Sequence, residues 1–464
     1  MKKSIVFILG LFLPGPVTSA QTVQLPAALQ SPLAQALSRN KEIQNKALEL
    51  EKSALERKSV RAKYIPRLDA TAGYAYLNNQ VTIDVPGTTL PLTGYELFSG
   101  KTRVNADAQV AHAGLMAKSV LFSGGQIGNG AKALEQKAIG DSLLIETDRD
   151  NLTVDVISSF DKIHFIKASE RLVAESERRL LKEEERVAKA IANGLAVPFD
   201  RDKIKLARLE LESKRTQLEE NKALLFQKLS YLTGMTHAEL EAISYELEPI
   251  VLPEDLTVED KQELAALDAY QKAAGYALKR ERGTYLPQAA AFGGLSYTRI
   301  FKGSADFNIP YLPAPLPQPH LKLNELTLAP NWMAGVLLKW EIFGGTERSH
   351  KVQQARLNLR QLENRREDSR DKLGLLLQQK KASYHTQWKQ IDLARQQEVV
   401  ARNTLTLAEK QYVQGLISVS QRLEAENDFV KVAQNQTETL VNQRQAALEA
   451  LAVTGHLGEK IVFQ

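Results

Sequence analysis

The side chains that most often carry catalysis or bind metals are sparse in this chain and lack the spacing that such chemistry needs. There are seven histidines and no cysteine, and no two histidines stand in the His-x-x-x-His spacing that holds zinc on a helix. One glycine-rich stretch, residues 123–128, lacks the lysine and spacing of a phosphate-binding loop. We therefore predict no enzymatic activity, metal site or cofactor, and interpret residues 123–128 as a flexible junction between a strand and a helix.

The charge distribution argues against a nucleic-acid partner, and the first residues indicate export. The formal net charge is only +5 over 464 residues, with basic and acidic side chains interspersed. Residues 1–20 combine Lys2 and Lys3 with a short apolar run and the small residues Thr18-Ser19-Ala20, which predicts a secretory signal peptide. The apolar run is shorter than the about 20 residues that span a bilayer as a helix.

Four short anchors recur at a constant offset of 221 positions, which predicts an internal duplication. They are Tyr64-Ile65-Pro66 with Tyr285-Leu286-Pro287, Phe122-Ser123-Gly124 with Phe343-Gly344-Gly345, Gly194-Leu195 with Gly415-Leu416, and Thr233-Gly234 with Thr454-Gly455. We expect repeat 1 at residues 21–242, a proline-containing linker at 243–256, repeat 2 at 257–455 and a C-terminal tail at 456–464.

Each repeat contains one segment with a period of two, which predicts β-hairpins at residues 67–122 and 288–343. The apolar residues of one face are Leu68, Ala70, Ala72, Tyr74 and Tyr76 in the first hairpin and Trp332, Ala334, Val336, Leu338, Trp340 and Ile342 in the second. Trp332 and Trp340 suit the aromatic belt at a membrane interface. The proline-containing residues 84–102 and 300–330 are predicted to be long loops that project into solvent.

The remaining segments favour helices of unusual length. Entry helices are expected at about residues 31–63 and 257–283, long helices at 125–192 and 347–413, and return helices at about 200–232 and 420–452. Seventy helical residues extend about 100 Å. A heptad seam, which predicts coiled-coil packing, is formed by Ile204, Leu211, Leu218, Leu225 and Leu232. Smaller residues occupy the equivalent positions in repeat 2, namely Ala425, Val432, Thr439, Ala446 and Val453.

Four strands per chain have a physical consequence if they lie in lipid. Every backbone amide must then be paired, which only a closed barrel achieves, and the smallest membrane barrels have about eight strands. The chain must therefore oligomerise, and the fold class is a mostly α, α+β membrane protein with a long-helix coiled coil. The alternative is a non-channel scaffold or adhesin of the envelope, a coiled coil with two decorative hairpins. In a third, weaker hypothesis the loop 300–330 is a surface receptor site.

The order of elements and the anchors make the chain similar to the TolC-like outer-membrane efflux proteins over nearly its whole length. The resemblance includes the strand-to-helix junctions at residues 121–125 and 340–345, the Gly-Leu turns and the Thr-Gly repeat ends. Many multidrug members of this family carry a lipidated amino-terminal cysteine. This chain has no cysteine, so it resembles the unlipidated branch.

The resemblance implies a homotrimer with a 12-stranded β-barrel in outer-membrane lipid and a helical tunnel that extends into the periplasm. Such proteins are passive exit ducts of tripartite efflux or type I secretion systems. Their partners are a periplasmic adaptor, also called a membrane fusion protein, and an inner-membrane transporter.

The helix-to-helix turns at residues 193–200 and 414–421 are the first candidate site, because in the family this periplasmic tip docks on the adaptor. The docking residues expected here are Gly194, Leu195, Val197, Gly415, Leu416 and Val419. The glycines permit the left-handed backbone that ends a helix, and Asp200 and Ser420 are possible helix caps. The alternative is an ordinary turn whose apolar residues pack on each other.

The second candidate site is a constriction of the tunnel, which the family forms with acidic residues near the tip. The matching positions are Thr406 and Glu409. Three copies of Glu409 around an axis would repel one another and favour cations. Thr406 departs from the acidic pattern, which predicts one ring fewer and weaker cation selectivity. The alternative for Glu409 is a solvated side chain beside Lys410.

Overall fold

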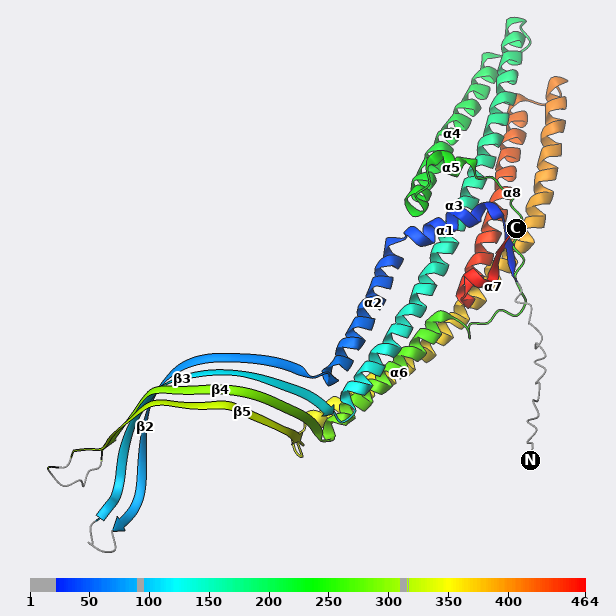
Figure 1. Cartoon of the computed structure of the whole chain (residues 1–464). Helices are drawn as coiled ribbons and strands as arrows, with labels where there is room; N and C mark the ends of the chain where they lie inside the picture. Colours follow the sequence, from blue (N-terminus) through cyan, green and yellow to red (C-terminus); the bar gives the residue numbers. More distant parts are fainter. Residues whose placement is uncertain (1–21, 90–95, 309–314, 316) are drawn as a thin grey trace, which may run out of the picture. The chain divides into compact units, whose positions relative to one another are not determined.

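The structure, a computed structural model, describes residues 22–89, 96–308, 315 and 317–464 (Figure 1). The expected signal peptide at residues 1–20 lies outside them. The chain forms two compact units. Unit 1 contains the residues up to Lys52, Gln136–Gln271 and Arg360–Gln464, and unit 2 contains Ser53–Glu135 and Lys272–Leu359.

Most of the described chain is helical, and two helices are exceptionally long. The α-helices are α1 (Gln30–Arg39), α2 (Lys41–Arg61), α3 (Gln126–Ala192), α4 (Pro198–Thr233), α5 (His237–Ala242), α6 (Gln262–Arg282), α7 (Glu347–Val413), α8 (Val419–Thr454) and α9 (Leu457–Lys460). Short 3-10 turns are η1 (Ala27–Leu29), η2 (Ala62–Tyr64) and η3 (Gly283–Tyr285). Helices α3 and α7 each contain 67 residues, as the absence of interior proline predicts. No helix in the described ranges has an apolar stretch long enough to cross a membrane.

The first entry helix is divided, contrary to the expectation of one helix over 31–63. Asn40 separates α1 from α2, and its side-chain oxygen accepts a hydrogen bond from the backbone N–H of Ile43 at 3.0 Å. An asparagine in this position satisfies a free donor of the next helix and so favours a new start over continuation.

Four long strands form an antiparallel sheet in the order β2-β3-β4-β5 (Figure 1). The strands of unit 2 are β2 (Arg67–Thr89), β3 (Glu96–Phe122), β4 (Gln288–Asn308) and β5 (His320–Lys339). The predicted loops at 84–102 and 300–330 are therefore too long, because the strands continue deep into both. Proline is tolerated where the ladder is irregular: Pro86 falls at the register shift between Val85 and Thr88, and Pro330 falls near the shift opposite Ser296 and Thr298.

A second, two-stranded sheet was not predicted. Strand β1 (Val23–Leu25) pairs in parallel with β6 (Ile461–Phe463), so the expected tail at 456–464 is an ordered part of unit 1. Val23 and Leu25 are 4% and 2% exposed. They join the main apolar core of unit 1, which α3, α4, α7 and α8 complete.

The linker between the repeats is fixed by buried polar groups. The carboxylate of Asp161 on α3 accepts hydrogen bonds of 2.8 Å from both Tyr245 Oη and Arg444 Nε, and Arg444 Nη1 donates to the carbonyl of Glu248 at 2.7 Å. Asp161 and Arg444 are almost fully buried. Burial beside this carboxylate raises the pKa of Tyr245. A buried ion pair with further hydrogen bonds fixes geometry, and here it holds residues 243–256 against α3 and α8.

The strand-to-helix junction of repeat 1 is tightly packed, and its interpretation as flexible is wrong. Ser123 is buried, and its hydroxyl accepts a hydrogen bond from the backbone N–H of Ile127 at 3.2 Å. Gly124 has φ +64°, and a Cβ there would lie 2.4 Å from the carbonyl oxygen of Gly283. The glycine is therefore needed for both its backbone conformation and its close approach to the equivalent entry turn of repeat 2.

Candidate functional site

The two helix-to-helix turns of unit 1 have the same backbone geometry. Gly194 and Gly415 both have φ +73°, the left-handed conformation. Leu195 N–H donates to the Ala190 carbonyl at 2.8 Å, and Leu416 N–H donates to the Gln411 carbonyl at 2.9 Å. Each glycine N–H also donates to the carbonyl three residues earlier, at 3.0 Å, and the two bonds together are the Schellman ending of a helix. The backbone is thus satisfied internally, which leaves the side chains of both turns free to project.

The first turn exposes a small apolar surface. Leu195 is 82% exposed, and Val197 and Phe199 are also exposed. Pro198 occupies the first turn of α4, where its missing N–H costs nothing. The N-cap of α4 is Val197 without a side-chain bond, so Asp200 is not the cap that the sequence suggested.

The second turn exposes fewer apolar side chains than expected. Leu416 is 68% exposed, but Val419 is 4% exposed and packs among buried residues of α3 and α4. The expectation that Val419 is a contact residue at the surface is therefore wrong. The cap of α8 is Ser418, which forms a reciprocal capping box with Gln421, and Ser420 is not the cap.

A contact joins the two turns. Lys203 Nζ, in the second turn of α4, donates to Ser420 Oγ at 2.5 Å and lies 4.6 Å from the ring centroid of Phe199. Beneath both turns is one apolar cluster shared by three helices, which buries Val173, Leu180, Val187, Ile204, Ala207, Leu211, Val419 and Leu423. The seven-residue spacing of Ile204 and Leu211 is thus a packing seam at this end of α4. The two turns form one supported surface.

Glu409 belongs to a charge network that the sequence did not predict. Its carboxylate lies 3.5 Å from Arg422 Nη2, and Arg422 also lies 3.1 Å from Glu426. Glu426 pairs with Arg179 of α3 at 2.7 Å and accepts a hydrogen bond from Ser176. Arg422 and Glu426 are 2% and 1% exposed, whereas the Glu409 side chain is 39% exposed. Glu409 is therefore the accessible end of a buried chain of alternating charges.

Thr406 does not join this network. It is exposed, and its hydroxyl donates to the Arg402 carbonyl one turn earlier at 2.9 Å. Lys410, the expected neighbour of a solvated Glu409, forms no ion pair with it; the partner is Arg422. The signal that could have found the network is the spacing of Arg422 and Glu426, four residues apart on an otherwise apolar face of α8.

Tyr412 lies near the C-terminal end of α7, on the side that faces the apolar cluster below the turns. It packs against the cluster below the turns, and burial raises the pKa of its hydroxyl, with Glu183 and Asp200 adding to the effect. Glu183 of α3 and Asp200 of the first turn therefore place negative charge near Tyr412, and Arg186 and Arg422 offset it in part.

The sheet of unit 2 places the two tryptophans differently. Trp332 is 72% exposed on β5, in register with Leu295 of β4 and through it with Leu115 of β3. Trp340 lies beyond the end of β5 at Lys339, and its Nε1 donates to the Tyr285 carbonyl at 3.1 Å. Trp340 and Ile342 are thus not strand residues, contrary to the sequence prediction.

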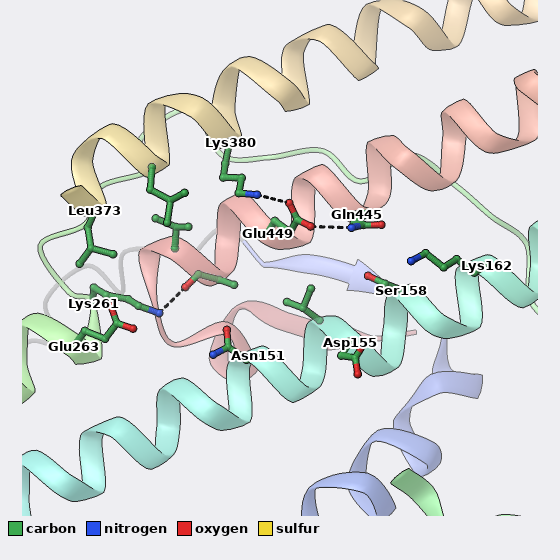
Figure 2. Close-up of a pocket in the computed structure, with 14 residues that line it drawn as sticks. Asn151, Asp155, Ser158, Lys162, Lys261, Glu263, Leu373, Lys380, Gln445 and Glu449 are labelled. Carbon is green, nitrogen blue, oxygen red and sulfur yellow. Dashed lines mark hydrogen bonds and ion pairs between the residues drawn. The ribbon is translucent and has the colours of Figure 1, made fainter. Parts of the chain in front are cut away.

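A polar cavity of about 380 Å³ in unit 1 is a further candidate site (Figure 2). Lys380 donates to Glu449 at 2.7 Å, and Lys261 donates to the Ala452 carbonyl at 2.8 Å. Burial lowers the pKa of Lys261. Lys380, Glu449 and Lys261 are thus bonded within the protein, and no group of metal-binding side chains is present in the described parts of the chain.

Comparisons with known proteins identify relatives of this architecture. Residues 255–455 match the family model named outer membrane efflux protein. None of the curated protein sequences matches the chain. A membrane protein from Pseudomonas aeruginosa has a similar structure, with a TM-score of 0.73 and 15% identity, covering 94% of this chain and 95% of the other.

Two further solved structures are similar over most of their length. The Campylobacter jejuni CmeC outer membrane channel gives a TM-score of 0.70 at 14% identity, covering 92% of this chain and 85% of the other. The Vibrio cholerae outer membrane protein VceC gives a TM-score of 0.69 at 14% identity, covering 92% of this chain and 96% of the other. At such identities the likeness concerns the fold.

Proposed function

We propose that the chain, in which residues 255–455 match the family model named outer membrane efflux protein, lies in the outer membrane, extends into the periplasm and is the passive exit duct of a tripartite efflux or type I secretion assembly. Three copies form the duct. The turns after α3 and α7 dock on a periplasmic adaptor, and an inner-membrane transporter supplies the substrate.

The observation that carries the proposal is the pair of open edges on the four-stranded sheet. Strands β2 and β5 are its edges, and they contain 23 and 20 residues. Unpaired strand edges of this length cannot lie in lipid. Because the four strands alternate in direction, β5 of one copy can pair antiparallel with β2 of the next. Repetition of this contact closes a barrel, and three copies supply twelve strands.

The turns support a docking role by exposure and by rigidity. Leu195 and Leu416 are exposed at 82% and 68%, although neighbouring apolar residues are buried in a common cluster. Both backbone turns are fully bonded, so little conformational entropy is lost when a partner binds. An apolar partner such as a helical hairpin of an adaptor suits this surface.

The experiment is conductance of the purified protein in planar bilayers, combined with its migration on gels before and after heating. A trimeric duct gives stable single-channel currents and an oligomer that heating dissociates. A monodisperse monomer without currents would overturn the proposal and favour the envelope scaffold.

A further inference from the structure

The four-stranded sheet exposes apolar side chains on one face near the helices and on the opposite face toward its hairpin ends. The β2–β3 ladder has no register shift from Arg67–Lys118 to Val85–Gly100, so residue parity in β2 assigns each side chain to a face. We call the two surfaces the even face and the odd face, after the numbering in β2. Residues 67–76 of β2 and their partners form the proximal half, and residues 77–84 and their partners form the distal half.

In the proximal half the even face is apolar in the rows nearest the helices, whereas its rows through Tyr74 and Tyr76 also carry Gln109, Arg299, Thr327 and Glu325. One row of residues in register contains Ala70, Leu115, Leu295 and Trp332. Leu68, Tyr74 and Tyr76 continue this surface along β2 and are exposed. The odd face of the same half carries Asp69, Thr71 and His112 near β2 and β3, and Ile300, Leu326 and Leu328 on β4 and β5. This is the pattern of a membrane barrel, with lipid on one side and water on the other.

In the distal half the polarity reverses. The even face now carries only polar and charged residues, namely Asn78, Gln80, Thr82, Asp84, Lys101, Arg103, Asn105, Asp107, Ser304, Asp306, Asn308, His320 and Lys322. The odd face carries the apolar set Leu77, Val81, Ile83, Val104, Ala106, Ala305, Phe307, Leu321 and Leu323. Val81, Val104 and Phe307 stand in one row.

The exchange of apolar and polar residues between the two faces has two structural causes. In β2 and β3 the ladder is regular, so the sequence itself changes phase. In β4 a bulge at Lys302, with φ +52°, inserts one residue between the partners of Asp107 and Gln109. The bulge transfers the odd-numbered residues of β4 to the other face. In β4 and β5 the apolar residues of the odd face begin earlier, at Ile300, Leu326 and Leu328, and the apolar distal surface continues from them over four strands.

The apolar surface of the distal odd face is partly covered by its own sheet. Val104 and Thr102 in the central strand β3 are 7% exposed, whereas Val81 and Ile83 on the edge strand remain 48% and 44% exposed. An apolar patch that stays accessible in one copy marks a contact surface.

Strand length places the distal half outside the bilayer. A tilted strand crosses a membrane with about 9–11 residues. The apolar even face from Leu68 to Tyr76 contains nine residues, and β2 continues to Thr89. If the proximal half spans the membrane as the proposed function requires, the distal half lies beyond it, in water.

We propose that the distal halves of three copies meet across the axis of the duct through their odd faces and form an apolar constriction at its outer mouth. The inference rests on the proposed function, because ring closure through β5 and β2 keeps the even face outside along the whole strand. In the closed ring, the distal odd face of each copy therefore faces the distal odd faces of the other two copies. A narrow apolar ring resists ions because water leaves it readily.

The test uses the absence of cysteine in the natural chain. Single variants Val81→Cys and Leu323→Cys place a thiol on the odd face. The matched controls Gln80→Cys and Lys322→Cys place one on the even face of the same strands. Trimers in outer-membrane vesicles are treated with a bulky membrane-impermeant maleimide and, separately, with a short bis-maleimide cross-linker. Each preparation is also run unheated on a gel and measured in planar bilayers.

Odd-face thiols are expected to react with the bulky maleimide at least tenfold more slowly than their controls and to cross-link between chains. Equal labelling rates, or absence of cross-links, would overturn the constriction. Labelling of odd-face thiols only by a lipid-soluble maleimide would also overturn it, since the distal half would then face lipid. If a variant forms trimers and conducts but gives one of these contradicting labelling or cross-linking results, only the constriction is refuted. If the cysteine-free parent forms neither trimers nor currents, the proposed function itself is refuted.

Discussion

The carboxylate of Glu409 and the guanidinium of Arg422 lie 3.5 Å apart, joining α7 to α8 below the second turn. Glu409 keeps part of its surface in water, while Arg422 is buried between Glu409 and Glu426. Arg422 thus partly neutralises the charge that Glu409 presents to a tunnel. The same ion pair also fixes the position of the Glu409 carboxylate.

Glu409→Gln is expected to raise the concentration of a trivalent cation needed for half-block of single-channel current, by about threefold. The loss of a partly screened charge from a threefold ring is worth somewhat less than 1 kcal/mol. Thr406→Val is the control, because the hydroxyl of Thr406 bonds only its own helix. Unchanged block in Glu409→Gln would remove this residue from the constriction.

Glu426→Gln is expected to destabilise unit 1 by about 3 kcal/mol, because it leaves Arg422 and Arg179 without their shared buried partner. Arg422→Met should cost less, since Glu426 then keeps Arg179 and Ser176. Loss of helical circular dichroism on heating measures both. The exposed pair Asp368–Lys372 supplies the control Asp368→Asn, with an expected change below about 0.5 kcal/mol. An equal effect of Glu426→Gln and Asp368→Asn would contradict the assignment of the buried network.

The double variant Leu195→Asp, Leu416→Asp is expected to abolish export while trimers and conductance remain, because charge at both exposed turn residues opposes an apolar contact. Drug susceptibility of cells that carry the variant, compared with purified-channel currents, measures the two properties. Leu375→Asp, at an equally exposed position on α7, is the control. If the turn variant exports normally, the turns are not the docking surface.

Val419→Ala tests whether Val419 stabilises the second turn from below or contacts the docking partner. Its side chain is buried in the cluster below the turns, so shortening it should lower stability by about 1–2 kcal/mol through a small cavity. Export at permissive temperature should be retained. A selective export defect at unchanged melting temperature would return Val419 to the docking surface.

A decrease in pH is expected to lower the free energy of unfolding of unit 1, because His164 binds a proton more readily in the unfolded chain. Burial lowers the pKa of this imidazole in the folded protein, with Arg171, Lys167 and Arg444 adding to the effect. Between the lowered folded value and the ordinary value of about 6.5, the unfolded chain binds more protons, so stability falls as pH decreases through that window. The melting temperature at pH 5 relative to pH 7.5 should fall less in His164→Gln. An identical pH dependence in both proteins would exclude His164.

The sequence predicts the repeated architecture well because its signals are local. The 67-residue helices follow from the absence of interior proline, and the Gly194 and Gly415 turns follow from duplicated Gly-Leu pairs. The strands are underestimated because the prolines within 84–102 and 300–330 indicate loops, whereas irregular ladder positions accommodate Pro86 and Pro330. The fold class thus follows from patterns visible along the chain.

The sites are harder to predict because they depend on tertiary contacts. The sequence indicates that Val419 is a residue of the turn, but not that α3 and α4 cover it. It places Glu409 near the tip, but its partner stands thirteen positions away and the next member, Arg179, lies on another helix of the other repeat. Contacts between different helices leave no periodic trace in one sequence, so only the spacing of Arg422 and Glu426 within α8 could have indicated this network.

The parallel pairing of Val23 with Ile461 imposes an order on biogenesis. Residues 23–25 are synthesised early, yet their hydrogen-bond partners at 461–463 emerge only after everything between them. Until then strand β1 stays uncovered and the core of unit 1 is incomplete, so this unit can finish folding only after the whole chain has been made. A chaperone that recognises short extended apolar segments could bind β1 in that interval.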